Sequence, residues 1–309
     1  MSIKNLLELN SSELTEFFQS FDVVLCDCDG VLWLEHVPIL GVKETLSTLK
    51  ACGKRVYFVS NNCSGGTKHV LNGLHKIDEN LQEHDVVIPT QAIISFLKEI
   101  NFDKKLFVLG TNAMKKNLID AGFALTNTED IDFMELMSIY KHGNKHDEDI
   151  GACILDFDYE LSYKKLLEFM IYLNDEEVLF IVGATDKALP LSSKKFLIGP
   201  WYFENMLQER TNRTSMRFGK PSSNLHKFIS KKYNIENPSR VLFIGDSLDQ
   251  DIQFGINCGY QTLLVLTGVT KLQDLERLSS DEMPGYYING FADLDLLIKN
   301  NLIVTNGAT

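Results

Sequence analysis

Short apolar runs recur along this chain of 309 residues, separated by stretches that mix apolar and polar positions. An unbroken apolar run is typical of a strand buried on both faces of a parallel sheet. Several intervening stretches repeat apolar residues at helical spacing, as in Val42, Leu46 and Leu49. Strands that alternate with helices predict an α/β fold with a parallel sheet. The clearest predicted strands are 23–27, 56–59, 106–109, 152–155, 178–182, 241–244 and 262–266.

The alternation forms two series rather than one. A second series begins at about residue 92, and the first pattern resumes near Phe218. The simplest interpretation is one α/β core, residues 1–91 and 216–309, interrupted by an inserted α/β domain at 92–215.

One stretch of the insertion, residues 127–150, is polar and charged, and we expect an exposed loop there. His142 and His146 within it have the spacing of a metal-binding pair on a helix. Gly143 between them argues against a helix and therefore against that pair.

The composition is that of an ordinary globular protein with an acidic balance. Apolar residues make up 44% of the chain, charged residues make up 23%, and the formal net charge is −12. Such a charge repels nucleic acid and anionic membrane surfaces, so we expect neither as a partner. A phosphorylated substrate would be repelled as well, unless its site carried local cations such as a metal ion or lysines.

The six cysteines are scattered, without the pattern of a metal site. Cys26 and Cys28 are separated by one residue, which is not the spacing of a zinc site. We interpret all six as reduced thiols of a cytoplasmic protein. The first ten residues lack the apolar run of a signal peptide, and no apolar run approaches the length of a membrane span.

The most informative segment follows the first predicted strand. Asp27 and Asp29 lie one residue apart where that strand ends, and Gly30 allows the backbone to turn sharply. Ligands of open α/β sheets bind at the carboxyl ends of the strands. Two close carboxylates repel each other unless a cation or a shared proton intervenes, and Mg²⁺ prefers such oxygen ligands. The alternative is an ordinary turn, in which Asp and Gly are common.

Polar residues stand at three further predicted strand ends or loops. Taken singly, they could be a turn, an exposed lysine and a helix cap. Together with the first motif they supply a nucleophile, a proton donor, a phosphate-binding group and a metal site, which phosphoryl transfer requires. We therefore expect four distant segments to form one site. The additional residues are Ser60, Asn61 and Asn62 after the second strand, Lys220 before a helix, and Asp246 and Asp251 after a later strand.

These segments, in this order, resemble the four motifs of the haloacid dehalogenase superfamily of phosphatases. The chain is most similar to the branch of pyridoxal phosphate phosphatase (chronophin), phosphoglycolate phosphatase and p-nitrophenyl phosphatase. The resemblance implies a Rossmann-like parallel-sheet core with an inserted α/β cap domain. Many relatives form homodimers through this cap, so a homodimer is a possible partner arrangement here. It is carried by Asp27 to Trp33, Ser60 to Asn62, Ala184 to Asp186, Phe218 to Ser222, Gly245 to Ile252 and Leu266 to Thr270.

The resemblance also implies a role for each matching residue. Asp27 would be the nucleophile and a Mg²⁺ ligand. Asp29 would be the general acid and base, with its backbone carbonyl on the metal. Asp246 would complete the protein ligands, and Asp251 would support them. The phosphate group would be bound by Lys220, Ser60, Asn61 and Asn62, and Asp186 would face the substrate from the cap.

We therefore expect a Mg²⁺-dependent phosphomonoesterase that acts on a small phosphorylated metabolite through an aspartyl phosphate. A dehalogenase would not need the acid Asp29. A protein phosphatase and a catalytically silent scaffold of the same fold are the alternatives. After Asn62 the chain has Cys63 to Gly66, where relatives often carry an arginine-bearing stretch. The substrate therefore stays open among pyridoxal phosphate, phosphoglycolate, a nucleotide, a sugar phosphate and a phosphoprotein.

Overall fold

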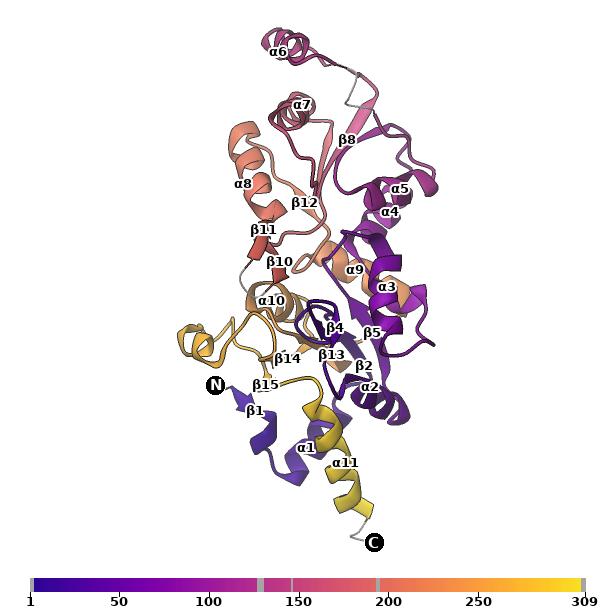
Figure 1. Ribbon diagram of the computed structural model, residues 1–309, viewed down its shortest axis with the longest axis vertical. Coiled ribbons are helices and arrows are strands. Elements are labelled where there is room, and N and C mark those ends of the chain that lie inside the picture. Colours follow the sequence, from indigo (N-terminus) through magenta and orange to yellow (C-terminus); the bar gives the residue numbers. More distant parts are fainter. Residues whose placement is uncertain (1–2, 127–130, 146, 193–194, 307–309) are drawn as a thin grey trace. The chain divides into compact units, whose positions relative to one another are not determined.

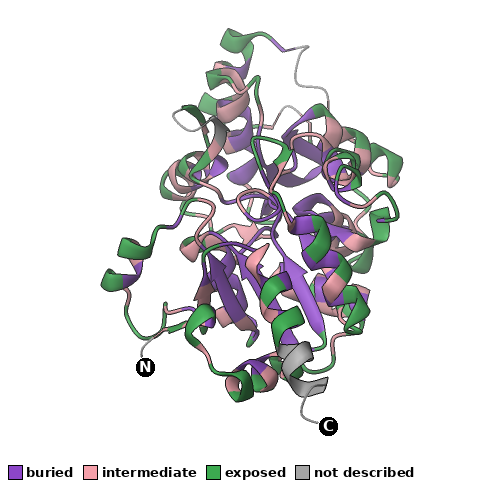
Figure 2. Cartoon of the chain, turned by 60° about the horizontal axis from the view of Figure 1, so that its bottom comes forward, coloured by how far each residue is buried: buried purple, intermediate pink, exposed green. Residues whose placement is uncertain are grey.

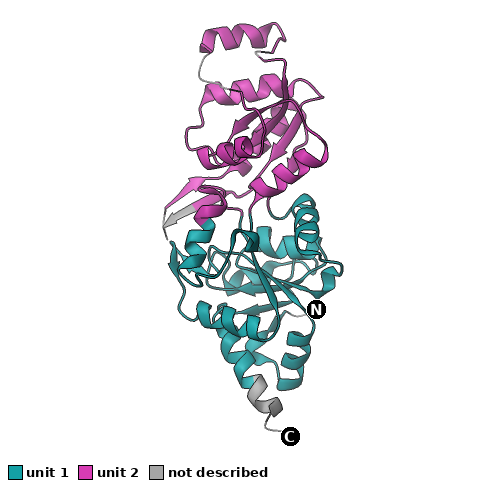
Figure 3. Cartoon of the chain, turned by 90° about the vertical axis from the view of Figure 1, so that its right-hand side faces the viewer, with its two compact units in different colours: residues 1–60, 70–87, 220–309 teal, residues 61–69, 88–219 magenta. Residues whose placement is uncertain are grey.

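The computed structural model describes residues 3–126, 131–145, 147–192 and 195–306. The chain divides into two compact units, which Figure 3 colours separately. Unit 1 contains residues 1–60, 70–87 and 220–309, and unit 2 contains residues 61–69 and 88–219. Each unit combines helices with a parallel sheet, which confirms the predicted α/β fold class. Among the described residues, no helix combines the length and the apolar character needed to cross a membrane.

Unit 1 is built on a seven-stranded sheet in which all neighbouring strands are parallel (Figure 1). The strand that precedes Asp27 is central and completely buried, with Val24 paired to Leu242 on one side and to Val56 on the other. In spatial order the strands are β1 (Lys4–Asn5), β15 (Tyr286–Ile288), β14 (Gln261–Val265), β13 (Val241–Gly245), β2 (Val23–Cys26), β5 (Arg55–Val59) and β6 (Val86–Val87). The apolar runs predicted as strands in this unit are confirmed. Its edge strands β1 and β6 have two residues each, which is too short for a recognisable apolar pattern in the sequence.

The helices of unit 1 pack around the sheet, and α1 (Ser11–Gln19) and α9 (Ser223–Tyr233) begin at residues whose side chains cap them. Before the first helix, Asn10 and Glu13 form a capping box, in which each side chain accepts a hydrogen bond from the backbone of the other. Figure 2 shows that the buried residues gather in the strands and the exposed ones on helices and loops. The helices are α1 (Ser11–Gln19), α2 (Val42–Ala51), α3 (Gly66–His75, which starts in unit 2), α9 (Ser223–Tyr233), α10 (Gln253–Asn257) and α11 (Asp293–Asn306).

Unit 1 also contains several short elements. The strands β3 (Trp33–Leu34) and β4 (Val37–Pro38) form an antiparallel hairpin. A π-helical turn at Leu248–Ile252 follows β13, and 3₁₀ segments lie at Leu6–Glu8, Glu83–Asp85, Pro238–Arg240 and Leu272–Arg277.

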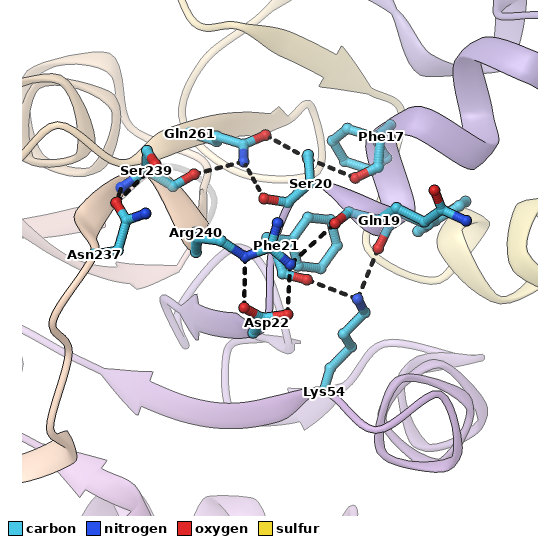
Figure 4. Close-up of polar contacts among 11 residues, drawn as sticks. Phe17, Gln19, Ser20, Phe21, Asp22, Lys54, Asn237, Ser239, Arg240 and Gln261 are labelled. Carbon is cyan, nitrogen blue, oxygen red and sulfur yellow. Dashed lines mark hydrogen bonds and ion pairs between the residues drawn. The ribbon is translucent and has the colours of Figure 1, made fainter.

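A network of hydrogen bonds and ion pairs lies at the amino-terminal ends of the central strands of this sheet (Figure 4). Nε and Nη2 of Arg240 each lie 2.6 Å from a carboxylate oxygen of Asp22, the residue before β2. Lys54, the residue before β5, donates to the carbonyl oxygens of Phe18 and Phe21 at 2.7 Å. These contacts fix the segments that lead into the two central strands.

Unit 2 has its own parallel sheet of four strands. Its core is rich in aromatic residues, including Phe107, Phe169, Tyr172 and Phe180. In spatial order the strands are β12 (Met216–Arg217), β9 (Leu179–Val182), β8 (Ile150–Leu155) and β7 (Lys105–Leu109). An antiparallel hairpin joins β10 (Ala188–Ser192) and β11 (Lys195–Ile198). The helices are α4 (Pro89–Glu99), α5 (Asn112–Asp120), α6 (Phe133–Lys141), α7 (Tyr163–Leu173) and α8 (Pro200–Thr211).

Helix α6 corrects the expectation of an exposed loop over residues 127–150. Asp132 caps this helix by accepting a hydrogen bond from the backbone N–H of Met134 at 2.7 Å. Its buried Leu136 packs with Leu167 and Ile171 of α7. The helix has a single apolar face, and the many charged residues around it hide the helical pattern in the sequence. His142 lies at the end of the helix, and His146 lies outside the described residues.

Candidate active site

The carboxyl ends of three neighbouring strands place polar residues side by side in unit 1. Asp27 follows β2, and its backbone N–H donates to the carbonyl oxygen of Ile244 in β13 at 2.9 Å. Asp246 follows β13, and Ser60 follows β5 on the other side of β2. All three residues are buried. The parallel sheet therefore brings together strand ends that are far apart in the sequence, as predicted.

Lys220 joins this group from the loop before α9. Its Nζ donates to Oδ1 of Asp27 at 2.6 Å and to Oδ1 of Asp251 at 2.7 Å. The lysine is 2% exposed, so these ion pairs lie away from solvent. Burial alone would lower the pKa of Lys220, but Asp251 and Asp27 raise it above its ordinary value. The lysine therefore stays charged at neutral pH.

Asp251 is held by the backbone of the turn that follows β13. Its Oδ2 accepts hydrogen bonds from the backbone N–H groups of Asp246 and Ser247, both at 3.1 Å. Its other oxygen bonds Lys220. Gly245 lies so close that a Cβ atom there would be 2.2 Å from the Cβ of Asp251. Asp251 thus fixes both Lys220 and the start of the loop that carries Asp246.

Three carboxylates are arranged so that they could hold a metal ion. One oxygen each from Asp27, Asp246 and Asp251 lies within 4.8 Å of the other two. Burial raises the pKa of Asp27 well above its ordinary value, and the nearby Asp251 and Asp246 raise it further, against the effect of Lys220. Burial and Asp251 raise the pKa of Asp246 to about 7. One lysine does not offset three buried carboxylates, so the cluster favours a bound cation or a proton.

Two loops pack closely against the carboxylate of Asp246, and each has glycine, Gly30 or Gly268, at the point of contact. A Cβ atom at Gly30 would lie 2.4 Å from Oδ2 of Asp246, and one at Gly268 would lie 1.8 Å from it. Gly30 also has a φ of +81°, which side chains disfavour. Oδ2 of Asp246 accepts a hydrogen bond from the backbone N–H of Val269 at 2.7 Å. An all-oxygen donor set of this kind fits a hard divalent cation.

Asp29 lies at the edge of the same site and is partly exposed. Nε1 of Trp33 donates a hydrogen bond to Oδ1 of Asp29 at 2.9 Å. The backbone N–H of Gly30 bonds the carbonyl oxygen of Trp33 at 2.9 Å, which closes the turn between them. Trp33 belongs to the first sequence motif, and its hydrogen bond to Asp29 is not predicted by that motif.

The remaining candidate residues lie in unit 2. Nδ2 of Asn61 donates to Oδ2 of Asp186 at 3.1 Å, so two segments that are distant in the sequence meet there. Oδ1 of Asn62 accepts a hydrogen bond from the backbone N–H of Ser64 at 3.1 Å. The structure thus gathers Asp27, Ser60, Lys220, Asp246 and Asp251 in unit 1, and it joins Asn61 to Asp186 in unit 2.

Comparison with known proteins agrees with this geometry. A family profile described as haloacid dehalogenase-like hydrolase matches residues 24–124, and a second, described as HAD-hydrolase-like, matches residues 217–294. Phosphoglycolate phosphatase 1A of Arabidopsis thaliana, a chloroplastic protein, is 32% identical over 92% of this chain and 78% of its own. The 4-nitrophenylphosphatase of Schizosaccharomyces pombe is 32% identical over 91% of this chain and 96% of its own.

A solved structure extends the likeness to three dimensions. The 4-nitrophenylphosphatase of Thermotoga maritima matches with a TM-score of 0.76 and 25% identity, over 90% of this chain and 98% of that one. The motifs, the sheet and these relatives point to one conclusion. The chain belongs to the haloacid dehalogenase-like hydrolases, in the branch of phosphatases that the motifs predicted.

Proposed function

We propose that this protein is a Mg²⁺-dependent phosphomonoesterase that acts on a small phosphorylated metabolite, with Asp27 as the nucleophile. The observation that carries the proposal is the position of Lys220, whose Nζ is shared by Asp27 and Asp251 while Asp246 stands on the adjacent strand end. The proximity of these side chains supports the proposed roles of Asp27 as nucleophile, Lys220 as fixed positive charge and Asp246 as a cation ligand. Phosphoryl transfer by an aspartate requires these groups.

The reaction would proceed in two steps that share these side chains. A carboxylate oxygen of Asp27 attacks phosphorus, the bond from phosphorus to the ester oxygen breaks, and Asp29 gives its proton to that oxygen. Asp29 then takes a proton from water as the water oxygen attacks phosphorus, and the bond to Asp27 breaks to release inorganic phosphate. Lys220 stabilises the negative charge of the phosphoryl oxygens in both steps.

The cation would be held by the side chains of Asp27 and Asp246 and by the backbone carbonyl of Asp29. Asp251 takes a supporting role, because Oδ1 bonds Lys220 and Oδ2 bonds two backbone N–H groups. When bound, Mg²⁺ supplies positive charge against the phosphoryl oxygens. Ser60 and the segment of Asn61 and Asn62 would bind the phosphate group.

We assign the catalytic core to residues 1–91 and 216–309, and the substrate-reading cap to 92–215. The contact between Asn61 and Asp186 supports a shared role for these two residues in holding the substrate. The relatives named for phosphoglycolate and 4-nitrophenyl phosphate support a small phosphorylated molecule. The six cysteines are free thiols, which supports a cytoplasmic location.

We also propose that a second copy of the chain packs on the β10–β11 hairpin of unit 2. Phe196 and Ile198 are two residues apart on β11, so they share one face of the strand, and they are 68% and 62% exposed. Light scattering should give the mass of a dimer. The double variant Phe196→Ser with Ile198→Ser should be a monomer, and a monomeric wild-type protein would exclude this interface.

The enzymatic proposal is tested with p-nitrophenyl phosphate. Purified protein should release phosphate when Mg²⁺ is present and should stop when EDTA removes the metal. Asp27→Asn removes the nucleophile with little change in volume, so it should abolish turnover while the circular dichroism spectrum stays that of the wild type. A wild-type protein without activity on a panel of phosphorylated metabolites would instead support the silent scaffold.

A further inference from the structure

A buried carboxylate that the proposed reaction does not use lies in unit 2. Asp156 follows β8 and is 3% exposed. Its Oδ1 accepts a hydrogen bond from the backbone N–H of Phe157 at 2.6 Å, and its Oδ2 accepts one from the backbone N–H of Ala184 at 3.1 Å. The buried thiol of Cys63 lies near this carboxylate, and each of the two groups affects the pKa of the other.

The Ala184 donor and the Cys63 thiol belong to the two segments of unit 2 that hold the proposed substrate-binding residues. Cys63 lies two residues after Asn61, and Ala184 lies two residues before Asp186. Asn61 and Asp186 bond each other directly at 3.1 Å. The carboxylate of Asp156 therefore bonds one of these segments through Ala184 and lies beside the other at Cys63.

Cys63 is itself held on other sides. Oγ1 of Thr90 lies 3.6 Å from its sulfur atom, and Oγ1 of Thr111 donates to its carbonyl oxygen at 3.2 Å. These threonines belong to the start of α4 and to the cap of α5. Threonines thus fix the segment at 61–63 to the helices, and the hydrogen bond between Asn61 and Asp186 joins it to segment 184–186.

The packing around Asp156 leaves no room for a larger neighbour. A Cβ atom at Gly183 would lie 1.9 Å from Oδ2 of Asp156. A Cβ atom at Gly219 would lie 2.5 Å from the carbonyl oxygen of Gly183 and 3.0 Å from Oδ1 of Asn61. Because glycine occupies both positions, the two segments can approach each other as closely as these hydrogen bonds require.

We propose that Asp156 is a positioning residue: its carboxylate holds segments 61–63 and 184–186 in one arrangement and thereby sets how tightly the substrate is bound. This role rests on the proposed function, because the residues that Asp156 would position, Asn61 and Asp186, are proposed to bind the substrate. It concerns binding rather than bond cleavage, because the proposed nucleophile, acid and metal ligands belong to unit 1.

The electrostatics of the cluster agree with this role. Burial raises the pKa of Asp156 to about 6, so the group is an ionised acceptor at neutral pH despite its burial. The titratable groups that face it are the thiol of Cys63 and the hydroxyl of Tyr159, and burial raises the pKa of both. Among these three described groups, the carboxylate of Asp156 is therefore the one that carries a charge above pH 6.

The test compares three variants with a matched control. Asp156→Asn places an amide where the carboxylate accepts hydrogen bonds, and Cys63→Ala removes the thiol beside it. Cys63→Ser keeps a donor at that position and should restore most of the lost affinity. Asp147→Asn is the control, because it removes an aspartate from an ion pair with Lys105 at the other end of the same sheet.

Two measurements are made on each variant of the full chain. With Mg²⁺ and p-nitrophenyl phosphate, Asp156→Asn should raise KM by about tenfold while kcat changes less than about twofold, as expected for a lost charged hydrogen bond that acts on binding. Amide hydrogen exchange should become faster in segments 61–66 and 183–187 and stay unchanged in β8. The control should match the wild type in both measurements.

Each outcome decides the proposal. Unchanged exchange in the two segments, or a fall in kcat with KM constant, overturns it. If Asp156→Asn does not fold, Gly183→Ala gives the same comparison, because its Cβ displaces the carboxylate without removing it. If the wild-type protein lacks activity, only the proposed function is refuted. Hydrogen exchange in Asp156→Asn still tests whether Asp156 positions the two segments.

Discussion

Nζ of Lys220 lies 2.6 Å from Oδ1 of Asp27, and both side chains are buried. This lysine is the cation that faces the carboxylates of Asp27 and Asp251. We expect Lys220→Met to lower kcat by about 10²- to 10³-fold, because the phosphoryl oxygens lose a preorganised positive charge. The variant should also lower Tm, since it leaves buried carboxylates unpaired. Phosphate release and thermal unfolding measure the two effects.

The matched control for Lys220→Met is Lys227→Met, which removes an exposed lysine from α9. Both variants change the net charge equally, so a general electrostatic effect would appear in both. Wild-type kcat in Lys220→Met would refute the assigned role of this lysine.

The hydrogen bond from Trp33 to Asp29 should orient the proposed acid. Trp33→Phe keeps an aromatic ring but removes the donor, so we expect kcat to fall by about tenfold with little change in KM, as for one lost hydrogen bond to a charged group. The chain has 2 tryptophans, so a Trp201→Phe background isolates the fluorescence of Trp33. In that background Asp29→Asn should shift the emission of Trp33, and an unshifted spectrum would mean that the contact does not form.

Removal of one carboxylate should reveal the metal site through stability. Without metal, Asp246→Asn should raise Tm, because it relieves repulsion within the cluster of Asp27, Asp246 and Asp251. Mg²⁺ at about 100 times its Kd should stabilise the wild-type protein by about 2.7 kcal/mol and should have little effect on Asp246→Asn. Equal stabilisation of both proteins by Mg²⁺ would place the ion elsewhere.

The central sheet and most of the candidate site could be predicted from sequence because their signals are local. Apolar runs such as Val241 to Ile244 are long enough to indicate strands, and polar residues directly after them fall at one sheet edge. The contact between Trp33 and Asp29 could not be predicted, since it depends on how one turn closes. Asp156 could not be predicted either, because a lone aspartate after a strand looks like any loop residue until Cys63 and Ala184 are placed beside it.

The network at the amino-terminal edge of unit 1 should affect stability without affecting catalysis. Arg240 bonds both oxygens of Asp22 in a two-pronged contact before β2. The hydrogen bond from Arg240 lowers the pKa of Asp22. Arg240→Ala should therefore lower Tm by a few degrees, and kcat should stay unchanged because the candidate site lies at the opposite ends of these strands. A double variant with Asp22→Ala should lower Tm little further, whereas additive losses would show that the pair does not act as a unit.

Asp156 gives the protein a pH dependence of stability whose sign can be stated. Burial raises its folded-state pKa from 3.8 to about 6, so the folded protein binds the proton more tightly than the unfolded chain does. Stability from this group is fully present below pH 3.8 and is lost as the pH rises through 6, by up to about 3 kcal/mol. Because other groups titrate equally in both proteins, the difference in Tm between wild type and Asp156→Asn isolates this effect. That difference should move in favour of the wild type as the pH falls from 7.5 to about 4.5. A constant difference across that range would show that Asp156 titrates at its ordinary pKa.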